Sequence, residues 1–294
     1  MARTANLYED GDAYERMMGR WSGIAGAKFL DWLDLPKGLR WLDVGCGNGS
    51  FTETLIARCV PSQVTAIDPS EEQLAFARKR PGTSVAQFRI GVAEALPLAD
   101  QSFDAGAMAL VLSLLPDPVK AAAELARVVR PDGWVATYMW DIPGGGLPTE
   151  PIYAGMRSLG LEPTFGPGAP ASARDKMQMT WKAAGLADVE TCVIKVPIVY
   201  CSFEDFWEAN DVPIGPSGNV LRAMRPEIKA ELKGAVRRQL PSAPGGQFCF
   251  EAFANAGQRQ SGGINDTRLP ELDFSWTSDI ASFCCRAAAR SLSD

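Results

Sequence analysis

Hydrophobic and polar positions follow two alternating spacings along the first half of the chain, and they predict strands and helices in turn. Five short apolar runs have the length of buried strands, and most segments between them carry apolar residues at helical spacing. The predicted strands are residues 40–44, 64–67, 85–90, 104–111 and 134–140. The predicted helices are residues 13–34 and 50–59, a segment opening at residue 70, and residues 117–129. This order is typical of an α/β, doubly wound parallel sheet with helices on both faces.

Local signals predict where several of these elements begin and end. The sequences SFTE from residue 50 and SEEQ from residue 70 have the spacing of capping boxes at helix starts. Asp117 followed by Pro118 predicts an N-cap and a proline in the first turn. The sequence PDG at residues 131–133 is expected to end that helix before the next strand.

The second half of the chain has a different composition and a less regular hydrophobic pattern. Residues 142–174 are rich in glycine and proline, and residues 257–294 show no sustained period, so we expect a loosely attached tail. Between these two segments, periodicity predicts helices at residues 175–184, 203–210 and 220–240, and strands at residues 189–200 and 247–254.

Composition and charge narrow the class of protein. The 294 residues suggest one large domain, or a domain with an insertion, with a formal net charge of -6 and a pI of about 5.0. Scattered Lys and Arg residues do not favour nucleic-acid binding. The longest apolar run, residues 105–115, is too short to span a membrane, and the N-terminus does not resemble a signal peptide. We therefore expect a cytoplasmic protein.

Histidine and cysteine usage limits the chemistry. The chain has no histidine, which excludes Ser-His-Asp hydrolases, Cys-His proteases and any histidine general base. The seven cysteines include no CxxC pair, so neither a zinc site nor a disulfide framework is indicated. Cys46 lies within a glycine-rich loop and is expected to fill space there.

The three glycines Gly45, Gly47 and Gly49 follow the first predicted strand in a G-x-G-x-G pattern. A dinucleotide fingerprint requires its third glycine where this chain has Ser50, and no GKS or GKT of a P-loop is present. The loop should lie where ligands bind in doubly wound sheets, beyond the carboxyl ends of the strands. Its ligand is therefore not expected to be a dinucleotide or a nucleoside triphosphate.

Two acids and a third segment indicate which ligand the loop would receive. Asp43 stands two residues before the first glycine; its carboxylate would attract an ammonium group rather than a pyrophosphate, or would order the loop. Asp68, at the end of the second strand, is placed to accept hydrogen bonds from ribose hydroxyls. Residues 91–94, with Ala93 and Glu94, follow the third strand, where an adenine would lie. An amino acid, a ribose and an adenine without phosphate make up S-adenosylmethionine.

Four sequences, in their order and spacing, resemble the class I S-adenosylmethionine-dependent methyltransferases: WLDVGCGNG, VTAIDPS, GVAEALPLADQSFD and LARVVRPDGWVATYMW. Within that class they are most similar to the ubiquinone and menaquinone biosynthesis group, with its methyltransferase type 11 domain. The resemblance covers about residues 8–256. It implies a Rossmann-like seven-stranded sheet with an antiparallel edge hairpin near residues 189–200 and 247–254. It also implies a helical insertion at residues 201–246.

The resemblance implies a domain organisation and a set of cofactor-binding residues. Residues 1–38 would form an N-terminal helical lid, 39–256 the methyltransferase domain and 257–294 a C-terminal tail. The expected cofactor-binding residues are Asp43, Gly45, Cys46, Gly47, Gly49, Asp68, Pro69, Ala93, Glu94, Met108, Tyr14 and Arg20. The chain departs from the family at Val92, where members often have an acid, and at residues 112–115, where they often have a histidine.

The most consistent function is methyl transfer from S-adenosylmethionine to a small, partly apolar acceptor. Phe203, Phe206, Trp207 and Val212 of the insertion would surround that acceptor, and residues 8–21 would close over the cofactor. Asp141, Tyr14 and Tyr138 are candidates for a general base, and no catalytic residue is assigned. The alternatives are a non-catalytic sensor or scaffold that binds S-adenosylmethionine, and a nicotinamide-dependent oxidoreductase.

Overall fold

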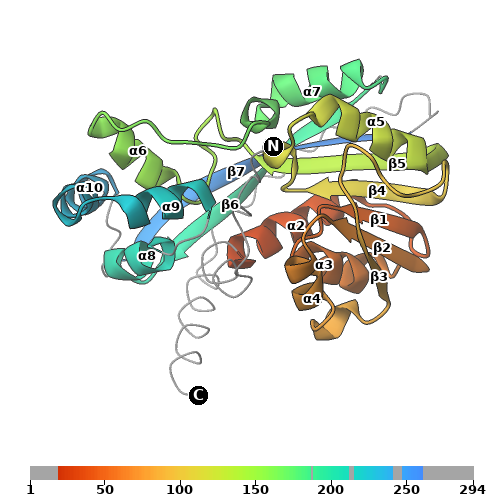
Figure 1. The fold of residues 1–294 in the computed structure, drawn as a ribbon, viewed down its shortest axis with the longest axis horizontal. Helices are drawn as coiled ribbons and strands as arrows, with labels where there is room; N and C mark the ends of the chain where they lie inside the picture. The colour runs from red at the N-terminus through yellow and green to blue at the C-terminus, as the bar shows by residue number, and fades with distance from the viewer. Residues whose placement is uncertain (1–18, 187, 212–214, 241–246, 261–294) are drawn as a thin grey trace.

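A seven-stranded sheet in the order β3-β2-β1-β4-β5-β7-β6 organises the chain (Figure 1). The structure is a computed structural model, and it describes residues 19–186, 188–211, 215–240 and 247–260. Five neighbouring strands are parallel: β1 (Arg40–Val44), β2 (Gln63–Asp68), β3 (Ala86–Ile90), β4 (Phe103–Ala109) and β5 (Val129–Trp140). The predicted doubly wound α/β sheet is confirmed.

The last two strands form the predicted antiparallel hairpin. β7 (Phe248–Gln260) lies between β5 and β6 (Glu190–Tyr200) and pairs antiparallel with both. β7 runs to Gln260, opposite Trp134, and so extends beyond the expected end at residue 254. Its backbone has a partner strand on each side, which lets small buried residues such as Ala254 and Ala256 continue the strand without a strong hydrophobic period.

Helices cover both faces of the sheet (Figure 1). One face carries α2 (Arg20–Leu33), α3 (Ser50–Cys59) and α4 (Glu71–Ala77), and the other carries α5 (Pro118–Val128) and α7 (Arg174–Ala183). Gly26 of α2 leaves little room for a side chain, because a Cβ there would lie 3.1 Å from the ring of Phe51 and from the Tyr138 hydroxyl. This close approach seats α2 on the buried face of β5. None of the helices in the described ranges combines the length and hydrophobicity that crossing a membrane requires.

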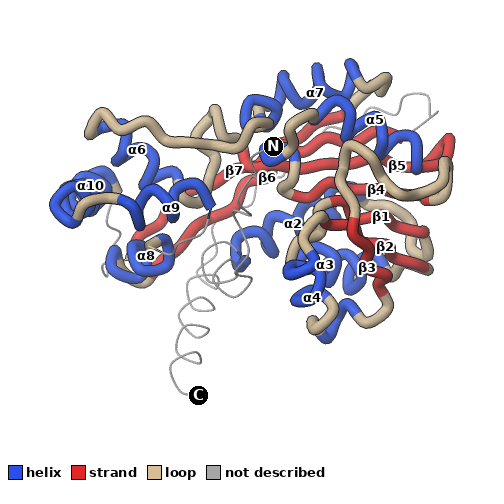
Figure 2. Tube along the Cα trace, viewed as in Figure 1, coloured by secondary structure: helices blue, strands red, loops and turns tan. Residues whose placement is uncertain are grey.

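The hairpin of β6 and β7 continues past the point where β5 ends. Trp140 at the end of β5 pairs with Ala254, so residues 248–253 and their β6 partners at 195–200 project beyond the carboxyl edge. The helices α6 (Glu150–Ser158), α8 (Phe203–Asn210), α9 (Gly215–Ala223) and α10 (Pro226–Gln239) gather around this projection (Figure 2). We call the projecting hairpin and these four helices the arm.

Aromatic side chains fill the interior of the arm and continue the hydrophobic core of the sheet. The ring of Phe203 lies 5.7 Å from that of Phe248, and the ring of Phe206 lies 5.2 Å from that of Tyr200. Phe203, Phe206 and Trp207 are all buried. The predicted helix at 203–210 is confirmed, and Ser202 caps it by accepting a hydrogen bond from the Asp205 N–H at 3.0 Å.

Two predictions about the arm's helices were wrong. The single helix expected at 220–240 is two helices, because Pro226 begins α10 and its ring disfavours helical backbone at Arg225. Helix α6 lies inside the Gly- and Pro-rich segment, where no element was predicted. It is held by packing, since a Cβ on its Gly155 would lie 2.5 Å from Val236 of α10.

The expected break at residues 131–133 is a bulge within β5. The register changes from Phe103 opposite Val129 to Ala105 opposite Trp134, so several residues of β5 stand opposite Asp104. The Asp104 carboxylate accepts hydrogen bonds from the Arg40 N–H, from the Arg40 guanidinium and from Arg130 Nε. These hydrogen bonds lower the pKa of Asp104, and the bond from the Arg40 side chain has the largest effect. They tie together the amino ends of β1, β4 and β5, opposite the carboxyl edge of the sheet.

Candidate functional site

The glycine loop lies between β1 and α3 at the carboxyl edge of the sheet. Gly45, Gly47 and Gly49 all have positive φ, at 74°, 52° and 81°. A Cβ on Gly45 would lie 2.4 Å from Val111, and one on Gly49 would lie 2.9 Å from Ala77. At Gly47 the nearest atom to such a Cβ is 4.0 Å away. Two of the glycines are therefore required by packing, and Gly47 presents backbone to open space.

The start of α3 differs from the predicted capping box. The N-cap is Gly49, and Ser50 is the first helical residue, so its hydroxyl does not cap the helix. The Asn48 side chain accepts a hydrogen bond from the Ser50 N–H at 3.1 Å instead. The Glu53 carboxylate bonds to Arg80 and to the Gly82 N–H. At Ser70 the predicted cap is confirmed, since its hydroxyl accepts from the Gln73 N–H.

Asp43 is fully buried beneath the loop. Its Oδ2 accepts a hydrogen bond from the Thr52 hydroxyl of α3 at 2.6 Å, and its Oδ1 is buried without a hydrogen-bond partner among the described residues. Burial raises the pKa of Asp43 to about 7. The hydrogen bond from Thr52 lowers this pKa, and the nearby charge of Asp68 raises it further. The Asp43 side chain thus orders the loop through α3 and leaves one buried oxygen unpaired.

Asp68 joins the glycine loop to the next strand. Its Oδ2 accepts from the Gly47 N–H at 2.8 Å, and its Oδ1 accepts from the Ser70 N–H at 2.9 Å. The residue is 9% exposed, and burial raises the pKa of its carboxyl while these two bonds lower it. Each oxygen has a second lone pair, so the carboxylate can accept further hydrogen bonds.

The remaining predicted residues around the loop differ in exposure. Ala93 is buried and Glu94 half-buried, within a turn in which Val92 and Ala95 form an isolated bridge. Pro69 is exposed beside Asp68, and Met108 is fully buried in β4. The structure brings the glycines, Asp43 and Asp68 together directly. It places the 92–95 turn after β3, the neighbour of β2.

The thiol of Cys46 does not have the surroundings of a nucleophile. Cys46 is 6% exposed, and burial, followed by the charges of Asp43 and Asp68, raises its pKa well above the ordinary value. A protonated, buried thiol packs as a small apolar group. Among the described residues, no three His, Cys, Asp or Glu side chains are grouped so that they could hold a metal ion.

Arg20 contacts the arm. Its guanidinium donates to the Val199 carbonyl of β6 at 2.6 Å and lies 3.9 Å from the centroid of the Trp21 ring. Trp21 Nε1 in turn donates to the Tyr200 hydroxyl at 3.2 Å. The start of α2 is therefore fastened to β6. Tyr14, the rest of the expected lid at residues 8–18, and Val212 lie outside the described residues.

Sequence reasoning missed three residues that shape the loop. Thr52 supplies the hydroxyl to Asp43, and Val111, after β4, packs against Gly45. Arg80 donates from Nε to the Asn48 carbonyl at 2.7 Å and from its terminal nitrogen to Glu53 at 2.9 Å. No local pattern marked Thr52 or Val111, whereas the contact between Arg80 and Glu53 depends on how the residues after α4 pack against α3.

The part of the chain around the glycine loop is similar to known proteins. The family described as a methyltransferase domain matches residues 42–137, which run from β1 into β5. The chain is 35% identical over 130 residues to a malonyl-(acyl-carrier protein) O-methyltransferase of Methylococcus capsulatus, covering 44% of this chain and 46% of that protein. It is 32% identical over 115 residues to a demethylmenaquinone methyltransferase of Desulfitobacterium hafniense, covering 37% and 46%. The chain thus spans less than half the length of these curated relatives.

Solved structures share the fold. A phosphoethanolamine N-methyltransferase 2 of Haemonchus contortus, in complex with phosphomonomethylethanolamine and S-adenosylhomocysteine, superimposes with a TM-score of 0.51 at 18% identity. The superposition covers 84% of this chain and 56% of that one. At this identity the likeness is one of fold, and it extends over the sheet beyond the family match.

We expect Gly49→Ala to destabilise the protein more than Gly38→Ala. Both glycines have a φ of 81°, so both substitutions place alanine in the left-handed region at a similar cost. A Cβ at Gly38 meets nothing within 4 Å, whereas one at Gly49 meets Ala77. Overpacking should make the Gly49 variant less stable by about a further 1–3 kcal/mol. Denaturant unfolding measures both, and equal losses would contradict the packing of α4 on the loop.

Asp43→Asn should remove a pH dependence of stability in the ligand-free protein. Because the folded pKa of Asp43 is raised to about 7, the wild type loses stability as pH rises from about 4 to 7, when the unfolded carboxyl ionises first. Between pH 5 and pH 8, the unfolding free energy of Asp43→Asn should therefore rise by about 2–3 kcal/mol relative to that of the wild type. The control is Asp104→Asn: Asp104 has a lowered pKa and is ionised throughout this range, so the difference from wild type should stay constant. A constant difference for Asp43→Asn as well would show that its carboxyl has an ordinary pKa.

Proposed function

We propose, from the class I methyltransferase domain that this chain carries, that it transfers a methyl group from S-adenosylmethionine to a small, partly apolar acceptor. The observation that carries the proposal is the Asp68 carboxylate, bonded to the Gly47 N–H beside the open backbone of the glycine loop. When bound, S-adenosylmethionine supplies a methyl group on a sulfonium, which leaves as a neutral thioether once the acceptor has taken the methyl. The protein has to hold donor and acceptor in line.

The residues present fit the amino-acid end of this cofactor. The open space at Gly47 allows a ligand to approach the backbone closely, where a side chain would block it. The Asp43 carboxyl is buried beneath the loop with its Oδ1 unpaired among the described residues, so a cationic group bound above the loop would favour its ionised form. Pyrophosphate would meet two carboxylates here, Asp43 and Asp68, so the site favours a cationic ligand over a dinucleotide.

The nucleoside end fits the neighbouring strands. Asp68 keeps acceptor capacity for the ribose hydroxyls after bonding to Gly47 and Ser70. The turn with Ala93 and Glu94 follows β3, the next strand toward the sheet edge, as the length of a nucleoside requires. The Haemonchus contortus N-methyltransferase structure in complex with S-adenosylhomocysteine shares the fold and supports this assignment.

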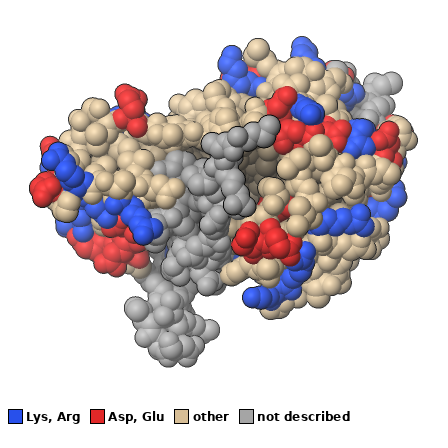
Figure 3. Space-filling model, viewed as in Figure 1, with Lys and Arg blue, Asp and Glu red and all other residues tan. Residues whose placement is uncertain are grey.

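The arm supports an acceptor that is partly apolar. Phe203, Phe206 and Trp207 are buried in ring contacts with Tyr200, Phe248 and one another, so they give the arm an apolar interior next to the carboxyl edge rather than line an acceptor site themselves. On the face drawn in Figure 3, acidic and basic side chains of the arm are interspersed, and pairs such as Arg237–Glu204 at 2.9 Å compensate each other. The two curated relatives, whose names specify an acyl-carrier-bound malonyl group and a quinone precursor, are consistent with acceptors that have apolar portions.

Catalysis in this proposal comes chiefly from positioning, which can lower a barrier by up to about 7–11 kcal/mol. Tyr138 is 1% exposed against α2 and is not placed to take a proton from an acceptor. The Asp141 carboxylate accepts from the Gly144 N–H and from Asn255 Nδ2, so it holds the loop after β5. We assign no general base. The N-terminal lid, residues 8–21, belongs to the same proposal.

The cofactor is tested by ligand-induced stabilisation of the full chain. S-adenosylmethionine and S-adenosylhomocysteine should raise Tm, by the equivalent of about 2.7 kcal/mol at a hundredfold excess over Kd, and NAD should not. Stabilisation by NAD alone would refute the proposal. Transfer of labelled methyl to apolar carboxylic acids and quinols then tests the enzyme activity, and tight binding with no transfer to any acceptor would favour a sensor.

The role of Asp68 is tested by a double-mutant cycle. Asp68→Asn should weaken binding of S-adenosylhomocysteine at least about tenfold, because a charge-assisted hydrogen bond contributes about 1.5–3 kcal/mol. Wild type should also bind the 2′-deoxy analogue more weakly, and this penalty should shrink in Asp68→Asn, by about 1 kcal/mol or more of coupling. Calorimetry measures the four affinities. Additive losses would mean that Asp68 acts only on the loop through Gly47.

A further inference from the structure

The connection between β3 and β4 crosses two strands without a helix. β3 and β4 are separated in the sheet by β2 and β1, and residues 91–102 join them entirely as loop and turn. Parallel strands are usually joined by a helix that supplies its own backbone hydrogen bonds. The backbone groups of this loop therefore need partners elsewhere.

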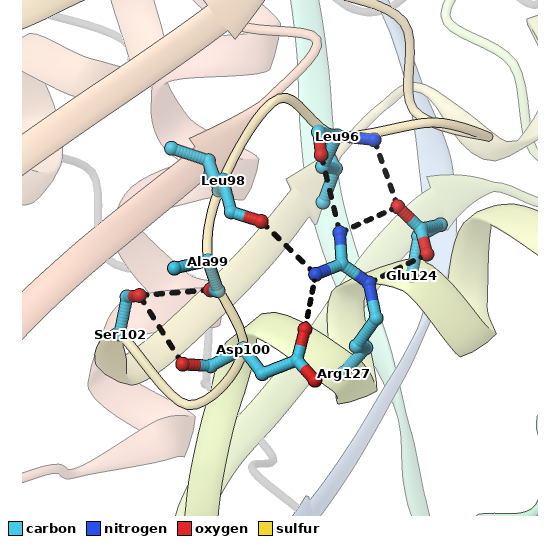
Figure 4. Close-up of polar contacts among 7 residues, drawn as sticks. All are labelled: Leu96, Leu98, Ala99, Asp100, Ser102, Glu124 and Arg127. Atoms are coloured by element: carbon cyan, nitrogen blue, oxygen red, sulfur yellow. Dashed lines mark hydrogen bonds and ion pairs between the residues drawn. The ribbon is translucent and has the colours of Figure 1, made fainter.

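Helix α5 provides those partners through Arg127 and Glu124 (Figure 4). The Arg127 guanidinium donates to the Leu96 carbonyl at 3.1 Å and to the Leu98 carbonyl at 2.9 Å. Glu124 accepts from the Leu96 N–H at 2.9 Å. The backbone carbonyl of Arg127 also accepts from the Gln101 N–H at 3.0 Å. The second half of the loop is thus bonded to α5 at several points.

The guanidinium is itself held in place by two acids. Arg127 donates to both oxygens of Glu124, at 2.7 and 2.8 Å, and to Asp100 at 2.6 Å. The hydrogen bond from Arg127 is the first cause of the lowered pKa of Glu124. The Arg127 side chain is 32% exposed, so its ion pairs with the two acids contribute little stability by themselves. Their effect is to orient the fork that binds the two carbonyls, a geometry that lysine cannot reproduce.

The turn at residues 92–95 is flanked by two residues, Gly91 and Leu96, whose backbone is hydrogen-bonded to other elements. On one side the Gly91 N–H donates to the Asp68 backbone carbonyl at 3.2 Å, and on the other Leu96 is bonded to Glu124 and Arg127. Gly91 also packs closely, since a Cβ there would lie 2.9 Å from Pro97. The turn itself has one internal backbone bond, from Ala95 N–H to the Val92 carbonyl. Buried Ala93 and a long contact of 3.5 Å from the Asp117 N–H to Glu94 Oε1 hold its middle, and the bonds at Gly91 and Leu96 fix its two ends.

We propose that Arg127 is a positioning residue that holds the 92–95 turn at the distance from Asp68 needed to read the adenine base of the cofactor. This inference rests on the proposed function, because it concerns the same ligand. Arg127 acts through the backbone at Leu96 and Leu98 and need not touch the cofactor. Adenine presents an amine donor and a ring acceptor, and hypoxanthine presents the reverse pattern. A turn held in place distinguishes the two bases, whereas one that moves accommodates both.

The test compares S-adenosylhomocysteine with S-inosylhomocysteine, which differ only in the base. Wild type should prefer the adenine compound by about tenfold or more, because the wrong base leaves polar groups unpaired. Arg127→Lys should reduce this preference to about twofold while weakening S-adenosylhomocysteine about tenfold. The control is Arg40→Lys, which disturbs a similar guanidinium fork on Asp104 at the opposite edge and should leave the preference unchanged. Affinities come from calorimetry on the full chain.

The outcomes separate this inference from the proposed function. If Arg127→Lys weakens both ligands equally and keeps the preference, the residue is only structural and the inference is wrong. An unaltered affinity and preference would also overturn it, as would a wild type that binds both compounds equally. Failure of wild type to bind S-adenosylhomocysteine at all would instead refute the proposed function. Should Arg127→Lys not fold, Glu124→Gln, which can still accept from Leu96, should shift the preference in the same direction by a smaller factor.

Discussion

The hydrogen bond between the Gly47 N–H and the Asp68 carboxylate is the constraint on which the site depends. It joins the glycine loop after β1 to the end of β2, beside the bonds from Gly45 and Cys46 to the Ile67 carbonyl. The backbone of Asp68 then accepts from Gly91 after β3. One residue therefore sets the spacing of three consecutive strand ends, and an error in its position would misplace every part of the candidate site together.

The sheet was predictable because its signals are local. Short apolar runs predicted β1 to β4, and the three glycines marked the turn into α3. The antiparallel pairing of β6 with β7 came instead from the family resemblance, since alternation alone cannot say which strands pair. The bulge in β5 was read as a break because Pro131 and Gly133 normally interrupt structure. The tertiary pairing with Asp104 overrides that local preference.

The candidate site was predictable in its residue types and less so in its geometry. Asp43 and Asp68 were identified from their place at strand ends, but the sequence could not show that Asp43 would bond to Thr52 or that Asp68 would hold Gly47. These contacts depend on how α3 and the loop pack in three dimensions. The same holds for Arg20, which was expected at the cofactor and bonds to Val199 of the arm.

The way the arm is attached has a consequence for how such a protein can diversify. The arm grows from two strands that run unbroken out of the sheet, with no linker between them and the sheet. The twist of β5, β6 and β7 therefore sets the direction in which the arm extends from the sheet. Helices in the arm can be exchanged or repacked without disturbing the loops at β1, β2 and β3. Sequence change in the arm can therefore alter the surface beside the carboxyl edge while the glycine loop and the ends of β1, β2 and β3 stay the same.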